Sequence, residues 1–372
     1  MLANVTIVLD EVVYLALIPL LPTYVHRFHL TTAGAGLLYA AYPILGLVSG
    51  IPAGLLCDRV GPRRMLLASN TLFVIASVAF ALATTASELW LARAAQGLAS
   101  GASATAGMAM VAGSAQSGRH GRTIGLAAAL QGLSALGGPA LGGLAVPAIG
   151  EGWAFAVPAV LGAFVVVGLA LEPRDEITAL GPGISAQLRS VVRNADARAA
   201  ALCFVAIGVV GGCVQTLAPL QLGGLGVSAR GLGLLFIVAA LAGFPIVAVA
   251  GRFIDAAGVV VATRVWVAIV LAVVLVLGAG PGRLGIALVF GLFLTQIRVG
   301  GTIGYVRGTY AGAERGLASG FGLIVTGWAI GASIGPVASG AIVDASGYPI
   351  AYLVSATALL ALTATAMRAE RH

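Results

Sequence analysis

The sequence predicts an all-α polytopic membrane protein of 12 transmembrane helices, arranged as two pseudo-symmetric six-helix bundles. Three observations lead to this fold class. Of the 372 residues, 59% are hydrophobic and only 9% are charged, whereas a soluble domain carries about 25% charged residues. Apolar runs of membrane-spanning length recur along the whole chain. The second half of the sequence also repeats the first half at a constant offset.

Twelve segments are long and apolar enough to cross a bilayer, which takes ~20 mostly apolar residues per helix. Each must be helical, because the lipid core offers the backbone no hydrogen-bond partners. The first segment is a membrane helix rather than a signal peptide, because it lacks a basic leader and contains two acids. The expected spans are 3–25, 32–56, 65–86, 88–113, 122–146, 152–171, 199–219, 230–251, 264–280, 284–306, 316–343 and 349–367.

The distribution of arginine predicts the orientation of these helices. With the N-terminus in the cytoplasm, fifteen loop arginines fall on the cytoplasmic side and three on the outer side, namely Arg27, Arg230 and Arg283. This asymmetry follows the positive-inside rule and predicts cytoplasmic N- and C-termini. The basic residues are all arginine, and alanine and glycine are abundant, which favours a bacterial inner membrane. The net charge of +7 reflects topology rather than nucleic-acid binding, because no basic patch alternates with aromatic residues.

An internal repeat aligns the two halves of the chain when the sequence is shifted by 197 residues. Matched proline and aspartate positions at one gap-free offset are hard to obtain by chance, even in a glycine-rich chain. The repeat predicts two homologous six-helix bundles. The matched pairs are Pro22 and Pro219, Gly54 and Gly251, Asp58 and Asp255, Gly61 and Gly258, Gly138 and Gly335, Pro139 and Pro336, and Gly143 and Gly340.

A long polar segment at residues 172–198 separates six expected spans from six. We expect it to be a cytoplasmic linker between an N-terminal bundle, 1–171, and a C-terminal bundle, 199–372. Its second half has apolar residues on one helical side and fits an interfacial amphipathic helix, although a solvated linker fits equally well. Repeated membrane bundles with a site between them are the architecture of alternating-access transporters.

Several motifs resemble those of the major facilitator superfamily, in its twelve-helix drug/proton antiporter branch. "GLLCDRVGPRR" at 54–64 resembles motif A of that family, and "GRFIDAAG" at 251–258 resembles a weaker second copy. "RAAQG" at 93–97 resembles motif B, and "GLSALGGPALGG" at 132–143 resembles motif C. "LDEVVYLALIPLLPTY" at 9–24 is similar to helix 1 of the same branch and of the vesicular amine transporters. The resemblance implies the fold of that superfamily and proton-coupled export.

The motif between the second and third spans is a candidate gate. Gly54 allows its helix to approach a neighbour closely, and Asp58 can cap the N-terminus of a facing helix, worth ~0.3–1 kcal/mol. The resemblance implies that this partner is the start of the eleventh helix. For the arginines, the alternative is plain positive-inside topology. The candidate gating residues are Gly54, Asp58, Arg59, Gly61, Arg63 and Arg64.

A second group of small residues predicts helix packing rather than chemistry. Gly138, Pro139 and Gly143 in the fifth span match Gly335 and Pro336 in the eleventh. Such small-residue faces let membrane helices pack closely. We also expect Pro139 to kink its helix.

Four charged residues lie within the expected spans, namely Asp10, Glu11, Arg93 and Arg298. Their charges sum to zero, as pairing would require. An acid that is alternately paired and unpaired can take up and release a proton, so Asp10 or Glu11 is the candidate proton carrier. The alternative is a static ion pair that fixes the first helix. The resemblance implies a role for Arg93 in proton transfer, and the alternative is that Arg93 holds the first and fourth helices together.

The resemblance implies that the first, fourth, seventh and tenth helices line a central cavity. Polar residues do fall on helical stripes in the fourth and tenth spans. Arg298 lies at a depth comparable to that of Asp10 and is a candidate counter-ion or substrate ligand, unless it extends to the headgroups. The candidate cavity residues are Tyr14, Tyr42, Gln96, Gln215, Thr295, Arg298, Thr302, Tyr305 and Trp328.

These features predict a proton-coupled secondary transporter that exports small drug-like molecules or metabolites. The alternatives are a proton-coupled uptake symporter for a small metabolite, anionic or not, and a non-transporting sensor or scaffold on the same fold. An enzyme is not expected, because the chain has no catalytic triad, HExxH or P-loop motif. We expect no cofactor or metal, with a proton (or Na⁺) as the coupling ion. The expected partners are a small-molecule substrate and the lipid bilayer, but no nucleic acid, and the expected state is a monomer.

Overall fold

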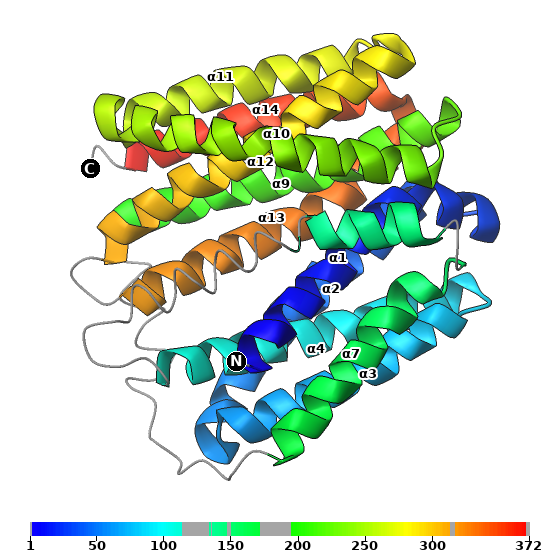
Figure 1. Cartoon of the computed structure of the whole chain (residues 1–372). Coiled ribbons are helices and arrows are strands. Elements are labelled where there is room, and N and C mark those ends of the chain that lie inside the picture. Colours follow the sequence, from blue (N-terminus) through cyan, green and yellow to red (C-terminus); the bar gives the residue numbers. More distant parts are fainter. Residues whose placement is uncertain are drawn as a thin grey trace. The chain divides into compact units, whose positions relative to one another are not determined.

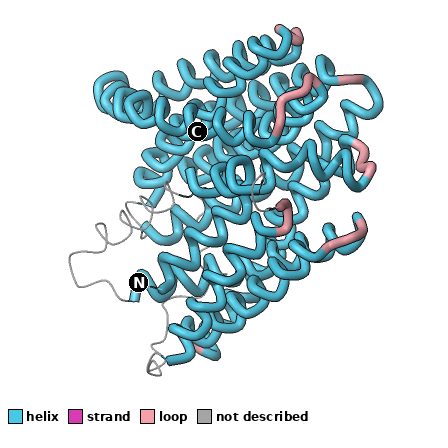
Figure 2. The backbone as a smooth tube through the Cα atoms, turned by 45° about the vertical axis from the view of Figure 1, so that its right-hand side comes forward, coloured by secondary structure: helices cyan, strands magenta, loops and turns pink. Residues whose placement is uncertain are grey.

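A computed structural model describes residues 2–113, 134, 136–146, 150–171, 195–312 and 317–369. Within these residues the chain is almost entirely helical, with short turns between helices and no strand (Figure 2). The expected linker, 172–198, falls mostly outside the described residues. The prediction of an all-α fold is therefore confirmed for the described part of the chain.

Eleven of the twelve expected spans coincide with continuous α-helices (Figure 1). Several helices extend beyond the apolar run that predicted them, because helical hydrogen bonding continues into the polar ends of a segment. The helices are α1 (Leu2–Phe28), α2 (Thr32–Val60), α3 (Pro62–Leu82), α4 (Ala86–Gly113), α7 (Trp153–Leu171), α9 (Ala195–Gly224), α10 (Ala229–Ala257), α11 (Val259–Gly278), α12 (Gly282–Gly312), α13 (Leu317–Ser346) and α14 (Tyr348–Ala369).

The fifth expected span, 122–146, lies largely outside the described residues. Its described end is helical and contains a π-helical segment, η1 (Ala140–Ala145), which begins directly after Pro139. Proline lacks the amide hydrogen that an α-helix would use, and π-helical turns are a recognised cause of helix kinks. The helix is thus irregular at the position where the sequence predicts a kink.

The described chain contains ten helices that are long and apolar enough to cross a membrane. The protein is therefore a multi-pass membrane protein. The helix α4 is not among the ten, because Glu88, Arg93 and several small polar residues lower its hydropathy. The polar residues of α4 become relevant below, because three of them take part in the candidate site.

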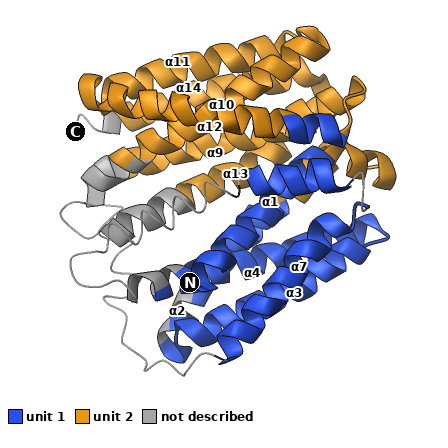
Figure 3. Cartoon of the chain, viewed as in Figure 1, with its two compact units in different colours: residues 1–20, 41–184, 229–234 blue, residues 21–40, 185–228, 235–372 orange. Residues whose placement is uncertain are grey.

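Residue contacts divide the chain into two compact units (Figure 3). Each unit contains a short segment from the opposite half of the sequence. The expected bundle boundaries at 171 and 199 stay a prediction. Unit 1 comprises residues 1–20, 41–184 and 229–234, and unit 2 comprises residues 21–40, 185–228 and 235–372.

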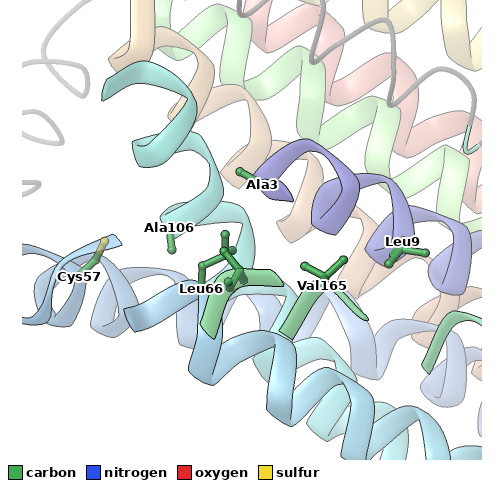
Figure 4. Close-up of a cluster of buried hydrophobic side chains, with 7 residues drawn as sticks. Ala3, Leu9, Cys57, Leu66, Ala106 and Val165 are labelled. Atoms are coloured by element: carbon green, nitrogen blue, oxygen red, sulfur yellow. The ribbon is translucent and has the colours of Figure 1, made fainter. Parts of the chain in front are cut away.

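In unit 1, α3 packs against both α4 and α7. A cluster of buried apolar side chains joins these helices to α1 and α2 (Figure 4). These side chains are apolar, so their packing holds the helices together without using hydrogen-bonding groups. The cluster consists of Ala3, Leu9, Cys57, Leu66, Ala106, Val165 and Leu169.

In unit 2, α9 packs against α12, α13 and α14. Its contact with α13 depends on glycines at four-residue spacing, because a Cβ on Gly331 or Gly335 would collide with the backbone of Val205 or Val209. Pro336 packs against Gly212 in the same interface. In unit 1, Gly138 lies against the α1 backbone. These placements agree with small residues that allow close helix packing.

Candidate functional site

The Asp10 side chain lies in the first half of α1 and receives hydrogen bonds from two other helices. The Tyr42 hydroxyl of α2 donates to Asp10 Oδ1 at 2.5 Å, and it also lies 3.0 Å from the Asp10 carbonyl oxygen. The Ser100 hydroxyl of α4 donates to Asp10 Oδ2 at 2.5 Å. Donors on both carboxylate oxygens stabilise the ionised form. These two donors explain in part why the apolar helix α1 tolerates a partly buried acid.

Glycines bring α2 and α4 close enough for these bonds. A Cβ on Gly97 would lie 2.9 Å from Tyr42 Cα, and a Cβ on Gly101 would lie 2.8 Å from the Gly46 carbonyl carbon. Real Cβ contacts of this length do not occur, so the crossing requires glycine on α4. Close backbone approach through small residues is a common packing mode of membrane helices. It positions Tyr42 and Ser100 on either side of the Asp10 carboxylate.

Arg93 is fully buried and binds α1 through backbone carbonyls. Its guanidinium donates to the carbonyl oxygens of Val13 at 3.4 Å and Tyr14 at 3.2 Å. The guanidinium carbon also lies over the rings of Tyr42, at 4.5 Å, and Tyr14, at 5.8 Å. The positive charge of Arg93 acts electrostatically on Asp10. Arg93 thus ties α4 to α1, and its part in proton transfer stays a prediction.

A further buried chain of hydrogen bonds extends from Arg93 to α3. The guanidinium donates to Gln96 Oε1 at 3.0 Å, and Gln96 Nε2 donates to Ser77 Oγ at 3.2 Å. Gln96 and Ser77 are both fully buried. Gln96 is therefore inaccessible to a solute in this conformation, although the sequence predicted a cavity position for it. Its hydrogen bond orients the Arg93 guanidinium, and its role as a cavity residue stays a prediction.

Ser77 and the pairing of Ser100 with Asp10 were not predicted from the sequence. Ser100 was visible as part of the polar stripe on α4, but the stripe does not identify the partner. Ser77 gave no signal, because an isolated serine in an apolar helix usually bonds to its own backbone. Only the relative rotation of α1, α2, α3 and α4 brings these side chains together.

Glu11 differs from its neighbour Asp10. Both side chains are partly buried, but among the described residues Glu11 has no hydrogen-bond or ion-pair partner. The ring of Tyr14, a candidate cavity residue, packs against Tyr42, with 5.2 Å between ring centroids, beside the Arg93 guanidinium. The two acids therefore have unequal surroundings, which the sequence alone did not distinguish.

Arg298 lies on α12 in unit 2 and is partly exposed. One guanidinium nitrogen donates to the Ala240 carbonyl oxygen of α10 at 3.4 Å, and the guanidinium carbon lies 5.5 Å from the centroid of the Phe244 ring. Its expected pairing with Asp10 stays a prediction, as does its role as a substrate ligand.

The remaining candidate cavity residues lie mostly on α12 and α9. Thr295 is buried and donates to the Leu292 carbonyl, and Thr302 donates to the Arg298 carbonyl. Gln215 donates to the Gly211 carbonyl of its own helix, and Trp328 is partly exposed. The side chain of Tyr305 lies outside the described part of the structure. Their roles as cavity residues stay predictions.

The candidate gating residues lie at the end of α2 and the start of α3. Gly61 has φ 88°, and its repeat partner Gly258 has φ 83°, so both turns use a backbone conformation that favours glycine. Arg63 donates to the Ala170 carbonyl of α7 at 3.1 Å. Arg59 and Arg64 are exposed. Gly54 and Asp58 belong to α2, but the surroundings of their side chains fall outside the described part of the structure.

The structure defines a helical multi-pass membrane protein with a hydrogen-bonded acid, Asp10, in its first helix. The sequence profile of the Major Facilitator Superfamily matches residues 2–313. This match covers most of the chain, so the protein belongs to the Major Facilitator Superfamily.

Three relatives share part of this sequence. An uncharacterised MFS-type transporter of Mycobacterium tuberculosis is 34% identical over 171 residues, which cover 44% of this chain and 25% of that protein. A multidrug resistance protein B homolog of the same species is 33% identical over 156 residues, 41% of this chain and 28% of that protein. A probable vesicular acetylcholine transporter of Danio rerio is 27% identical over 172 residues, 41% of this chain and 34% of that protein. Each match thus spans about a third or less of the relative.

Solved structures support the fold over the full chain. A bacterial homolog of the human lysosomal transporter Spinster, in an inward-facing and unoccupied conformation, superposes with a TM-score of 0.78 at 15% identity. That superposition covers 100% of this chain and 96% of the other. Two of these relatives are named as transporters, and the solved structure is a homolog of a transporter, which agrees with the expectation that this protein is not an enzyme.

Proposed function

We propose that this protein is a proton-coupled transporter that exports small drug-like molecules or metabolites from a bacterial cell by alternating access. The observation that carries the proposal is the Asp10 carboxylate, held within a membrane helix by hydroxyl donors from α2 and α4. A charge at membrane depth costs at least ~2.5 kcal/mol, and such residues usually mark ion or substrate pathways. Membership of a transporter superfamily supports this reading.

Asp10, rather than Glu11, is the proposed proton carrier. Protonation of Asp10 removes the negative charge that its donors stabilise. The Tyr42 hydroxyl is then free to bond the Asp10 carbonyl oxygen, which already lies 3.0 Å away. A proton on Asp10 therefore changes contacts between α1, α2 and α4. A proton on Glu11 would change no hydrogen bond between described residues.

Proton movement supplies enough energy for useful export. One proton that moves down a potential of roughly 150 mV releases ~3.5 kcal/mol, which corresponds to a several-hundred-fold gradient of substrate. The resemblance of residues 132–143 to the antiporter motif and the similarity to a multidrug resistance protein homolog favour export over uptake. Arg298, which is partly exposed, favours a substrate that is neutral, zwitterionic or anionic over a simple cation.

Inverted membrane vesicles with an acid interior test the proposal. Antibiotics and organic acids are added one at a time, and proton release is followed with a fluorescent pH probe. We expect at least one compound to release protons from vesicles with the wild type but not from vesicles with Asp10→Asn. The control is Glu88→Gln, which changes an exposed acid that caps its own helix, α4.

The outcomes separate the alternatives. Export fails if no compound in a broad panel moves protons. Uptake symport is then tested with the same compounds in right-side-out vesicles. A scaffold role predicts that Asp10→Asn changes no transport in either orientation.

A further inference from the structure

A carboxylate at the end of α13 caps the start of α2. Asp344 Oδ1 accepts a hydrogen bond from the Thr32 amide at 2.9 Å, and Asp344 Oδ2 accepts one from the Ala33 amide at 2.8 Å. The next free amide, that of Gly34, donates to Thr31 Oγ1 at 3.0 Å. The first turn of a helix leaves its amides without intrahelical partners. Asp344 therefore satisfies two amides of a helix that is 311 residues away in sequence.

Electrostatics explain why the acid stands at this position. Asp344 lies in the last turn of α13, where the negative end of the helix dipole disfavours an acid. The start of α2 supplies the opposite end of a helix dipole, with amide hydrogens pointing at the carboxylate. Asp344 is thus unfavourable for its own helix and favourable only against a second one.

The two helices also touch through their backbones beside this cap. A Cβ on Gly340 would lie 2.9 Å from Ala33 Cα, and a Cβ on Gly36 would collide with the Pro336 carbonyl. The crossing therefore has no space for side chains between α2 and α13. Any separation of the two helices must break both Asp344 hydrogen bonds.

The internal repeat places an equivalent crossing in unit 1. There a Cβ on Gly143 would meet Gly233 Cα and lie 2.8 Å from the Ala229 carbonyl oxygen. Gly143 and Ala229 correspond to Gly340 and Thr32 at the offset of 197 residues. The counterpart of Asp344 at that offset is Pro147, which has no carboxylate. The two crossings share their glycines, so the carboxylate is not required for the packing itself.

We propose that Asp344 is a gating residue that stabilises the outward-closed state by holding the outer ends of α2 and α13 together. The arginine distribution places both of these ends outside. The proposal rests on the proposed function, because an alternating-access transporter must open its outer end once in each cycle. The Asp344 hydrogen bonds break at that step and form again on closure. Loss of the carboxylate favours the outward-open state.

Distance measurements between spin labels test this gate without any substrate. The exposed residues His26 and Ser346 are replaced by cysteine and labelled, in a chain whose buried cysteines, Cys57, Cys203 and Cys213, are replaced by alanine. In Asp344→Ala we expect the ratio of long to short distances to rise by about two- to fivefold, the range for a charge at a helix terminus. Asp344→Glu should restore part of the short population.

A matched control separates gating from helix capping in general. Glu88 accepts hydrogen bonds from the amides of Thr84 and Thr85 at the start of α4, at 2.7 and 3.1 Å, so it caps its own helix. Glu88→Ala removes this capping carboxylate, as Asp344→Ala removes the other, and it should leave the distances unchanged. A second variant approaches the gate from the other partner. Thr32→Pro removes one donor at the first helical position, where proline is well tolerated, and it should produce a smaller shift in the same direction.

Two results would overturn the proposal. One is an unchanged distance distribution in both Asp344→Ala and Thr32→Pro. The other is an equal shift in Glu88→Ala. Failure of the proposed transport activity is distinguishable, because the distances are measured without substrate or proton gradient. A shift in Asp344→Ala without any proton release in vesicles would keep the gate and reject antiport.

Discussion

Tyr42 has one hydroxyl hydrogen and two acceptors on the same residue, the Asp10 carboxylate and the Asp10 carbonyl. Ser100 supplies the second donor to the carboxylate, and the Arg93 guanidinium lies over the face of the Tyr42 ring. One hydrogen can bond only one of these two acceptors well, so the hydroxyl orientation depends on whether the carboxylate is charged. In the proposed mechanism, Tyr42 links the protonation of Asp10 to the position of α2.

Replacement of Tyr42 by phenylalanine should change the pH dependence of transport. Tyr42→Phe removes a donor to the ionised Asp10, and a hydrogen bond to a charged group contributes ~1.5–3 kcal/mol. The protonated acid then persists to higher pH. Substrate-driven proton release should therefore require a pH about one to two units higher. Vesicle assays across a pH series measure this shift.

The control for this change is Tyr352→Phe, which removes a buried hydroxyl of α14 in unit 2. It should leave the pH profile in place. An unshifted profile in Tyr42→Phe would separate Tyr42 from proton coupling.

Arg93 should not tolerate replacement by lysine, which cannot make the three hydrogen bonds of the guanidinium. Arg93→Lys keeps the charge but loses the fork that reaches Val13, Tyr14 and Gln96 at once. We expect a loss of about 1–3 kcal/mol in stability, seen as a lower melting temperature in detergent. Arg252→Lys, at an exposed position on α10, should melt as the wild type does. Equal melting temperatures for all three proteins would contradict the structural role of Arg93.

At the scale of elements, hydropathy located the helices but not their ends or their contacts. The third span was expected at 65–86, whereas α3 covers Pro62–Leu82. Thr84 and Thr85 belong instead to the capped start of α4. Hydropathy measures the apolar core of a span, while the ends depend on caps and turn glycines such as Gly61. Asp10 and Arg93 could be identified as candidate site residues because they are charged residues within apolar spans. The side chains that surround them depend on how α1, α2, α3 and α4 are rotated, which the sequence does not give.

The crossing of α2 and α4 should be sensitive to a single methyl group. Gly97→Ala places a Cβ 2.9 Å from Tyr42 Cα, which pushes Tyr42 away from Asp10. Overpacking of this kind costs about 1–3 kcal/mol, so we expect a lower melting temperature and weaker proton coupling. Gly50→Ala on α2 is the matched control, because its Cβ would meet nothing within 4 Å. Equal effects of the two substitutions would argue against a specific contact.

At the scale of the whole molecule, the internal repeat was the most informative feature of the sequence. It predicted paired turns, which Gly61 and Gly258 form with similar φ values, and paired helix crossings, which Gly143 and Gly340 form in units 1 and 2. It could not predict where the halves differ. The acids of α1 have no counterparts at the repeat positions, Ile207 and Gly208. Asp344 likewise matches a proline. The proposed proton carrier and the proposed gating residue therefore both lie at positions where the two halves differ.

Charge movement in the purified, reconstituted protein after a pH jump, without substrate, tests the central claim that Asp10 binds the coupling proton. We expect wild type, Glu11→Gln and Glu88→Gln to give a transient current on a solid-supported membrane, and Asp10→Asn to give none. A current in Asp10→Asn equal to that of the wild type would contradict the claim. Loss of the current in Glu11→Gln, with Asp10→Asn unaffected, would assign the proton to Glu11 instead.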